Sequence, residues 1–136
     1  MCSNYKTVTA LDHLVQSFGV QRTEGAAPPE FDGEIWPLKL APFIRLDELG
    51  RRRVEAGQFG LLPHFAKEVK YGRRTYNARS ETVATLTSFR TAWKRGQRCI
   101  IPAEQIYEPN WETGKAIRWA VESPDGRPLG VAGVWA

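Results

Sequence analysis

The N-terminus carries the residues whose chemistry stands out most in this sequence. Cys2 follows Met1, and because an initiator methionine is commonly removed ahead of a small residue, we expect Cys2 to begin the mature chain. Its α-amine and thiol have ordinary pKa values of about 8 and about 8.5, so reactive forms of both exist near neutral pH. Such an aminothiol adds to an aldehyde to give a Schiff base and then a thiazolidine ring. The sequence therefore predicts a nucleophile for aldehydes.

The other cysteine and the two histidines do not extend this chemistry. Cys99 lies between Arg98 and Ile100 in an apolar run, where a buried small side chain is expected. Two cysteines are too few for a disulfide framework, and His13 and His64 show no zinc-binding spacing with them. We expect two reduced thiols, no metal and no cofactor.

Positive charge gathers in two stretches of a chain with net charge +4 and pI ≈ 9.3. One is the run 51–53, which is three arginines. The other interleaves cations with aromatic rings, namely Lys67, Lys70, Arg73, Arg74 and Arg79 with Phe65, Tyr71 and Tyr76. Phosphates attract cations and unpaired bases stack on rings, so the second stretch is typical of a single-strand-binding surface. Solvated charge with the rings turned into the core is an equally open alternative.

The pattern of apolar residues predicts one α+β domain with a largely antiparallel sheet. Apolar residues at helical spacing predict a helix over 11–18, with Thr9 as its N-cap and Gly19 just past its end. Residues 21–42 are rich in glycine and proline and predict a long irregular loop.

Short strands are predicted on either side of a second helical segment. Residues 43–46 and 59–62 have strand composition, and the charged segment between them is either a hairpin or a helical turn. Helical spacing follows from Val83 to Trp93, where Ser88 could begin a separate helix. Four further strands, separated by prolines, glycines and a turn at 123–126, are predicted at 99–101, 105–107, 117–121 and 129–134.

The ends of the chain also carry expectations. No apolar run approaches the roughly 20 residues of a membrane span, and no signal peptide is evident, so a cytoplasmic protein is expected. The strand at 129–134 leads to the last residue without a polar exit, so we expect residues 1–136 to form a single but incomplete domain.

Five segments, in order and spacing, resemble the SOS response-associated peptidase (SRAP) family. Phe59-Gly60-Leu61-Leu62-Pro63 resembles that family's Trp-Gly-Leu-x-Pro, and 131–135 resembles its Ala-Gly-Leu-Trp strand. The remaining segments are Met1-Cys2-Ser3-Asn4-Tyr5, the sequence Tyr-Asn-Ala-Arg-Ser-Glu-Thr at 76–82, and Arg-Cys-Ile-Ile-Pro-Ala-Glu-Gln-Ile-Tyr-Glu at 98–108. One such segment would be weak evidence, whereas five in register are specific.

The resemblance implies a compact β-rich fold with a positive channel for single-stranded DNA and the N-terminal cysteine at its floor. Members of the family cross-link themselves to abasic sites, which shields the lesion from strand cleavage, and are thought to remove their own leading residues. By this resemblance the partner is single-stranded DNA with abasic sites, the protein is a monomer, and it lies on the nucleoid when bound to DNA.

The matched motifs also imply roles for single residues. Cys2 would be the nucleophile, Asn77 would hold its amine, thiol or the sugar by hydrogen bonds, and Glu108 would transfer protons. Taken alone, Asn77 is more typical of a turn and Glu108 of a solvent-facing strand edge, and only the joint pattern of motifs favours the catalytic roles. Arg79 would grip a phosphate. The other residues expected to contact DNA are Arg73, Arg74, Phe65 and Pro42.

The chain departs from the family pattern in three places. Cys2-Ser3-Asn4 replaces Cys-Gly-Arg, which removes a cation beside the nucleophile, and 105–109 replaces Gly-Phe-Tyr-Glu-Trp. The loop before Pro42 matches Tyr-Asn-x-Ala-Pro poorly. The family's second half, with its His-Asp-Arg-Met-Pro-like segment, has no counterpart in these 136 residues, which could be a fragment, a shortened reading frame or a chain whose remaining strands come from elsewhere. If that half is truly absent, we expect weak folding and an adduct that forms and reverses slowly.

Two hypotheses from other classes remain open. An inactive or fragmentary module could bind single strands non-covalently through 65–79, with Cys2 incidental; an adduct that survives denaturing electrophoresis would exclude it. A cysteine-dependent peptidase is the other, although no Cys-His pair with a thiol-protease signature is present.

Overall fold

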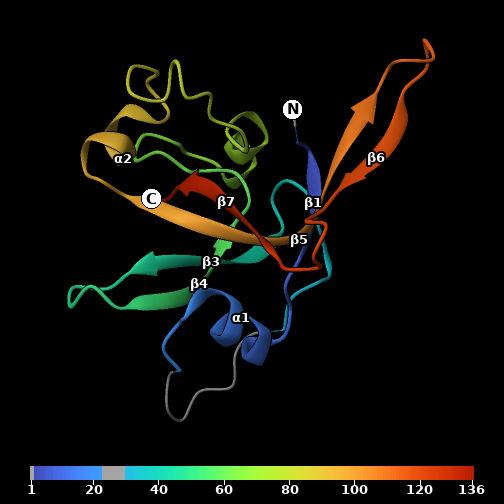
Figure 1. Cartoon of the computed structure of the whole chain (residues 1–136). Helices are drawn as coiled ribbons and strands as arrows, with labels where there is room; N and C mark the ends of the chain where they lie inside the picture. The colour runs from blue at the N-terminus through green and yellow to red at the C-terminus, as the bar shows by residue number, and fades with distance from the viewer. Residues whose placement is uncertain (1, 23–29) are drawn as a thin grey trace.

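Antiparallel strands make up most of the regular structure in this computed structural model, which describes residues 2–22 and 30–136. Figure 1 shows α1 on one side of the sheet and the segment that contains η1 and α2 on the other. In chain order the elements are β1 (Asn4–Thr7), α1 (Leu11–Phe18), β2 (Glu34–Ile35), β3 (Leu40–Leu46), β4 (Arg52–Gln58), the 3₁₀ helix η1 (Val69–Arg74), α2 (Arg90–Lys94), β5 (Arg98–Asn110), β6 (Ile117–Val121) and β7 (Leu129–Val134).

The long strand β5 organises the sheet. The strand order is β2-β1-β5-β3-β4, and β6 and β7 pair with successive parts of β5, all of them antiparallel. Tyr5 lies opposite Ile106, and Ile101 lies opposite Val131. Figure 1 shows the hairpin of β5 and β6 projecting from the rest of the molecule. The expected α+β class with a largely antiparallel sheet is therefore confirmed.

Three clusters of buried apolar residues hold the elements together. Tyr5, Ile35, Ala41 and Ala103 form one cluster between β1, β2, β3 and β5, and Cys2 packs against its edge. A second joins α1 to β3, and a third joins α2 to residues 61–89. Burial of apolar surface at about 25 cal/mol per Å² is the main force that fixes the short β1 beside β5.

The predicted helix at 11–18 is confirmed, but its cap is not. Gly19 has φ 61° and its N–H donates to the carbonyl of Val15 at 3.0 Å, as a left-handed C-cap does. Thr9 as N-cap is wrong, because Ala10 occupies that position and makes no side-chain capping bond. Packing of Leu14 into the core supports the helix in place of a cap.

The second helical segment is shorter than predicted. Residues 80–89 form successive turns, and α2 covers only Arg90–Lys94. Ser88 does not cap this helix, since Phe89 is the N-cap and the Ser88 hydroxyl instead pairs with the Tyr71 hydroxyl at 2.9 Å. The hydrophobic spacing from Val83 to Trp93 therefore reflects packing of turns as well as of a helix.

The strand prediction at 59–62 needs correction. Residues 59–62 are not a strand, because β4 ends at Gln58 and Gly60 adopts φ 122°. Their backbone instead bonds to Leu38, Lys39 and Thr75. The charged segment between 46 and 59 contains the turn and second strand of the β3–β4 hairpin, so the hairpin alternative is confirmed and the helical turn is wrong.

The predicted loop over 21–42 and the divided strands at 99–107 also differ from the structure. Within 21–42, residues 23–29 lie outside the described residues, whereas β2 and the start of β3 are regular. The two strands at 99–101 and 105–107 are one strand, β5, which continues through Pro102 and Pro109. The φ of proline is compatible with an extended backbone, and each proline costs the strand only one hydrogen-bond donor. Pairing of β5 with β1, β6 and β7 outweighs this loss.

Candidate active site

A cavity of about 670 Å³ brings the N-terminal segment together with the middle of the chain. Cys2 and Asn77 both line it. Most of the wall is apolar, and it includes residues of β3, β5, β7 and the segment 59–62. Few polar groups among hydrocarbon walls are typical of a site that binds a small organic group and orients it.

The segment that carries Asn77 is fixed to the end of β4 by backbone and side-chain bonds. The N–H of Leu61 donates to the carbonyl of Thr75 at 3.2 Å, and the buried Thr75 hydroxyl donates to the carbonyl of Leu61 at 2.6 Å. A Cβ on Gly60 would lie 2.3 Å from the carbonyl oxygen of Gly72. Two glycines thus allow the close backbone approach that places Asn77 at the cavity.

Cys2 is held at both its backbone and its sulfur. The Asn77 Nδ2 donates to the Cys2 carbonyl at 2.8 Å, across 75 residues of sequence. The Cys2 thiol donates to the carbonyl of Asn4 at 3.3 Å. The side chain is half-buried, so the sulfur has fixed surroundings and remains in contact with the cavity.

Burial and a nearby carboxylate control the acidity of this thiol. Burial raises the pKa of Cys2 above its ordinary value, the negative charge of Glu108 raises it further, and hydrogen bonding with the backbone of Asn4 and Tyr107 opposes the shift. At neutral pH the sulfur is therefore mostly protonated. A reaction at this sulfur needs a base that removes its proton.

The structure brings together the three residues expected to be catalytic. Cys2 and Asn77 are in direct contact. Glu108 is on β5 opposite Trp119 of β6, near enough for its charge to act on the Cys2 sulfur. In the described residues no group of three or more metal-ligating side chains is found, and no helix there has the length and apolarity of a membrane span.

The residues expected to contact DNA have different environments. Arg79 is exposed two residues after Asn77. Arg73 and Arg74 are exposed at the end of η1. The side chain of Pro42 is fully buried in β3 and forms part of the cavity wall.

Phe65 belongs to a second hollow of about 520 Å³, formed by residues 65–74. Its ring is 40% exposed and meets Tyr71 edge to face, with centroids 5.8 Å apart. The charged residues around the hollow are Lys67, Lys70, Arg73, Arg74 and one acid, Glu68, which pairs with Lys70 at 2.9 Å. Cations and an exposed ring thus lie together in this hollow, whereas Tyr76 of the same stretch lines the first cavity.

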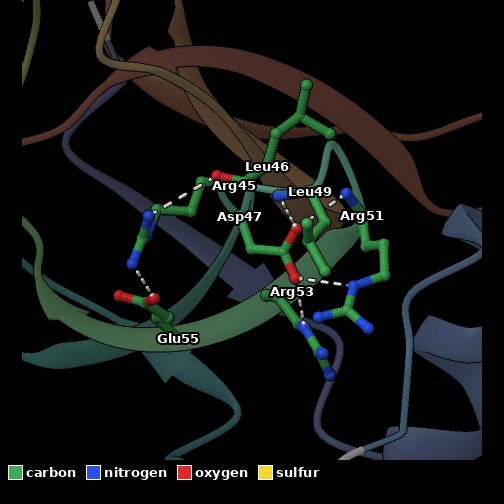
Figure 2. Close-up of polar contacts among 7 residues, drawn as sticks. All are labelled: Arg45, Leu46, Asp47, Leu49, Arg51, Arg53 and Glu55. Atoms are coloured by element: carbon green, nitrogen blue, oxygen red, sulfur yellow. Dashed lines mark hydrogen bonds and ion pairs between the residues drawn. The ribbon is translucent and has the colours of Figure 1, made fainter.

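The arginine run 51–53 has a different role, and Figure 2 shows two of its members, Arg51 and Arg53, around Asp47. Asp47 accepts from the Nε atoms of Arg51 and Arg53, both at 2.9 Å, and from two backbone N–H groups in the β3–β4 turn. These hydrogen bonds hold the pKa of Asp47 well below its ordinary value. Arg52 donates to the carbonyl of Phe18 at 2.7 Å. These cations stabilise the hairpin and its contact with α1.

The contribution of Asn4 was not evident from the sequence. The motif comparison marked this position only as a lost cation, whereas Asn4 is 4% exposed and its carbonyl accepts the Cys2 thiol. The available signal was the alternation of side chains along a strand. Because Tyr5 lines the cavity, the side chain of its neighbour Asn4 must point to the other face of the sheet.

The whole chain matches one protein family. The family model described as SOS response associated peptidase (SRAP) matches residues 1–136. The chain belongs to the SRAP family. Among related proteins, "Abasic site processing protein YobE" of Bacillus subtilis is 31% identical over 110 residues, and "Abasic site processing protein YoqW" of Bacillus phage SPbeta is 30% identical over 110 residues.

Solved structures share the fold of this SRAP chain. A protein from Bordetella bronchiseptica superposes with a TM-score of 0.84 at 34% identity, over 98% of this chain and 63% of its own. A protein from Bacteroides thetaiotaomicron superposes with a TM-score of 0.78 at 20% identity, over 98% of this chain and 61% of its own. The matches to the YobE and YoqW proteins cover 79% of this chain and 48% and 47% of those relatives, so the alignment spans about half of their length.

Proposed function

We propose that this SRAP chain binds single-stranded DNA and forms a covalent thiazolidine cross-link with abasic sites through Cys2 after removal of Met1. The observation that carries the proposal is the Asn77 hydrogen bond to the Cys2 carbonyl, which fixes the N-terminal residue in the cavity beside Glu108. Relatives named as abasic site processing proteins support the choice of substrate.

The reaction proceeds in two steps. The Cys2 α-amine attacks the aldehyde carbon of the opened deoxyribose, and loss of water leaves a C=N bond. The Cys2 sulfur then gives up its proton and adds to the same carbon, and the nitrogen takes up a proton to complete the thiazolidine. The net change is one water lost.

Each neighbouring group has a task in these steps. Glu108 accepts the thiol proton and returns a proton to nitrogen, and it donates to the ring oxygen when the sugar opens. Asn77 holds the Cys2 backbone so that amine and sulfur meet the same carbon, since fixed orientation replaces a search in solution. The same site removes leading residues ahead of Cys2, as the family description of a peptidase suggests.

The DNA strand is held by the exposed cations and the ring of the second hollow. Arg79 contacts a phosphate beside the lesion, and Arg73 and Arg74 contact phosphates farther along. Phe65 offers its exposed ring to a base. Pro42 shapes the cavity wall, and the protein acts as a monomer.

Intact mass spectrometry tests this function. The protein is mixed with a single-stranded oligonucleotide that carries one abasic site, and the expected mass is protein without Met1 plus oligonucleotide minus one water. An oligonucleotide with a tetrahydrofuran in place of the abasic sugar has no aldehyde and is expected to give no adduct. Retention of Met1, or an unchanged mass with the abasic strand, would refute the proposal.

Non-covalent binding alone is the second candidate function. The hollow at 65–74 favours it, because its cations and ring can bind a strand without any help from Cys2. It predicts a complex in native electrophoresis that disappears under denaturing conditions.

A further inference from the structure

Four side chains from four strands meet on the face of the sheet that points away from the cavity. Tyr5 and Ile106 lie opposite each other and line the cavity. Because successive side chains of a strand point to opposite faces, Asn4 of β1 and Tyr107 of β5 point to the other face. There they meet Glu34 of β2 and Arg118 of β6, which are 84 residues apart in sequence.

Specific contacts join these side chains, here called the clasp (Asn4, Glu34, Tyr107 and Arg118). The Asn4 Nδ2 donates to Glu34 Oε1 at 2.6 Å, and the Arg118 guanidinium pairs with the same oxygen. The guanidinium carbon lies 3.8 Å from the centre of the Tyr107 ring, as in a cation–π contact. The clasp thus links β1, β2, β5 and β6.

We propose that the clasp positions Cys2 for reaction, an inference that rests on the proposed function. Asn4 is 4% exposed and its own carbonyl accepts the Cys2 thiol, so any movement of Asn4 displaces the sulfur. β1 has only four residues, so few backbone hydrogen bonds hold it. The buried side-chain amide of Asn4 donates to Glu34, which ties β1 to β2. Arg118 in turn holds the Glu34 carboxylate in place.

The clasp acts on geometry more than on global stability. The side chains of Arg118 and Glu34 are 54% and 44% exposed, and ion pairs with this exposure contribute little to the free energy of unfolding. A small displacement of a reacting group, in contrast, slows a reaction strongly. Arg118 and Glu34 are therefore positioning residues, and their loss should change rate while leaving the melting temperature nearly constant.

Cross-linking kinetics of the full chain test the clasp. Arg118→Ala is compared with Lys39→Ala, which removes an exposed pair of similar burial, Lys39 with Asp32 at 3.3 Å. We expect Arg118→Ala to lower the rate constant at saturating abasic oligonucleotide by about tenfold. The half-saturating concentration and melting temperature should match those of Lys39→Ala, and Arg118→Lys should recover part of the rate.

Several results would overturn the inference. An unchanged rate constant in Arg118→Ala would show that the clasp does not position Cys2. A change confined to the half-saturating concentration would show that Arg118 binds DNA instead. Glu34→Gln keeps an acceptor for Asn4 but loses the ion pair, so a rate below that of Arg118→Ala would also contradict the model.

Failure of the proposed function can be told apart from failure of the clasp. If the unaltered chain forms no adduct, the cross-linking function is wrong. The clasp is then judged by hydrogen exchange of residues 2–7, which should be faster in Arg118→Ala than in Lys39→Ala. Equal exchange in the two variants would reject it.

Discussion

Two cysteines, Cys2 and Cys99, line the same cavity but have different surroundings. Cys2 is half-buried, its carbonyl accepts from Asn77, and its thiol lies within the influence of Glu108. Cys99 is 7% exposed near the start of β5, and a Cβ on Gly133 would lie only 2.9 Å from its sulfur. Burial alone raises the pKa of Cys99 to about 11.

If Cys2 is the nucleophile, as proposed, access to the cavity is not enough to make a cysteine reactive. Both thiols have raised pKa values, so both are mostly neutral at physiological pH. Under the proposed function Cys2 differs from Cys99 in two respects. The charge of Glu108 acts on its thiol, and removal of Met1 gives it an amine on the adjacent carbon. The predictions that follow test this contrast.

The largest expected effect is loss of the adduct when the terminal thiol is removed. Cys2→Ala should give no adduct with an abasic oligonucleotide that survives denaturing electrophoresis, because an imine without the neighbouring sulfur reverses. Cys99→Ala should form the adduct at a rate within about twofold of the unaltered chain. An adduct lost in Cys99→Ala, with its fold intact by circular dichroism, would erase the contrast.

Glu108→Gln should affect the two reactions of Cys2 in opposite directions. Cross-linking should slow by roughly a hundredfold, the range of a lost proton-transfer group. Alkylation of Cys2 by iodoacetamide at pH 8 should become faster, because the Glu108 charge raises the thiol pKa and its removal increases the thiolate fraction. Both rates can be followed by mass spectrometry.

Glu104→Gln is a matched control on the same strand. Glu104 pairs with Lys6 at 3.2 Å and is not among the groups that shift the Cys2 pKa. Its replacement should leave both rates unchanged. If the two variants behave alike, Glu108 has no special role at the sulfur.

The buried thiol of Cys99 should make the free energy of unfolding depend on pH above pH 9. The pKa of Cys99 in the folded chain, about 11, lies above its ordinary value of 9.0. The neutral thiol therefore stabilises the fold fully below pH 9, and this contribution is lost as the pH rises to 11. The loss is roughly 2 to 3 kcal/mol, at 1.36 kcal/mol per pKa unit.

Urea unfolding at pH 8, 9, 10 and 11 measures this loss. Other groups titrate in the same range, so the quantity of interest is the difference between the unaltered chain and Cys99→Ala. Between pH 8 and pH 11 the free energy of unfolding of the unaltered chain should fall by the predicted amount relative to that of Cys99→Ala. Parallel stability curves for the two proteins would mean that Cys99 is not the buried thiol described here.

The smallest effect is expected from the bond that holds the Cys2 backbone. Asn77→Ala removes one hydrogen bond, for which a net contribution of about 1 kcal/mol corresponds to a rate lower by about three- to tenfold. Asn77→Asp keeps the shape but cannot donate, so its rate should be at least as low. Stopped samples analysed on denaturing gels give both rates, and recovery in Asn77→Asp would point to packing instead of the hydrogen bond.

The sequence predicted features that depend on local pattern. The spacing of Leu11, Leu14 and Phe18 located α1, and Gly19 marked its end. The motif resemblance singled out Cys2, Asn77 and Glu108 by residue type and spacing, and the family is confirmed. The roles of these residues and the extent of the domain stay predictions.

The sequence could not predict features that depend on distant partners. Both stretches are basic, yet Asp47 and the carbonyl of Phe18 bind the arginines of 51–53, while Arg73 and Arg74 stay exposed. The strand pattern at 59–62 failed because backbone bonds to Thr75 and neighbouring segments replaced a sheet ladder. Charge and hydrophobicity of a segment do not identify its partners.

The sequence by itself determined the place of Cys2 directly after Met1, the family and the α+β class, because these follow from the order of residues and from local periodicity. Only the tertiary structure decided that Asn77 donates to the Cys2 carbonyl. It also decided that Asn4 donates to Glu34, and that Glu34 pairs with Arg118, on the face of the sheet away from the cavity. The physical reason is that hydrogen bonds and ion pairs act over a few ångströms, whereas these partners are 30 to 84 residues apart in the chain.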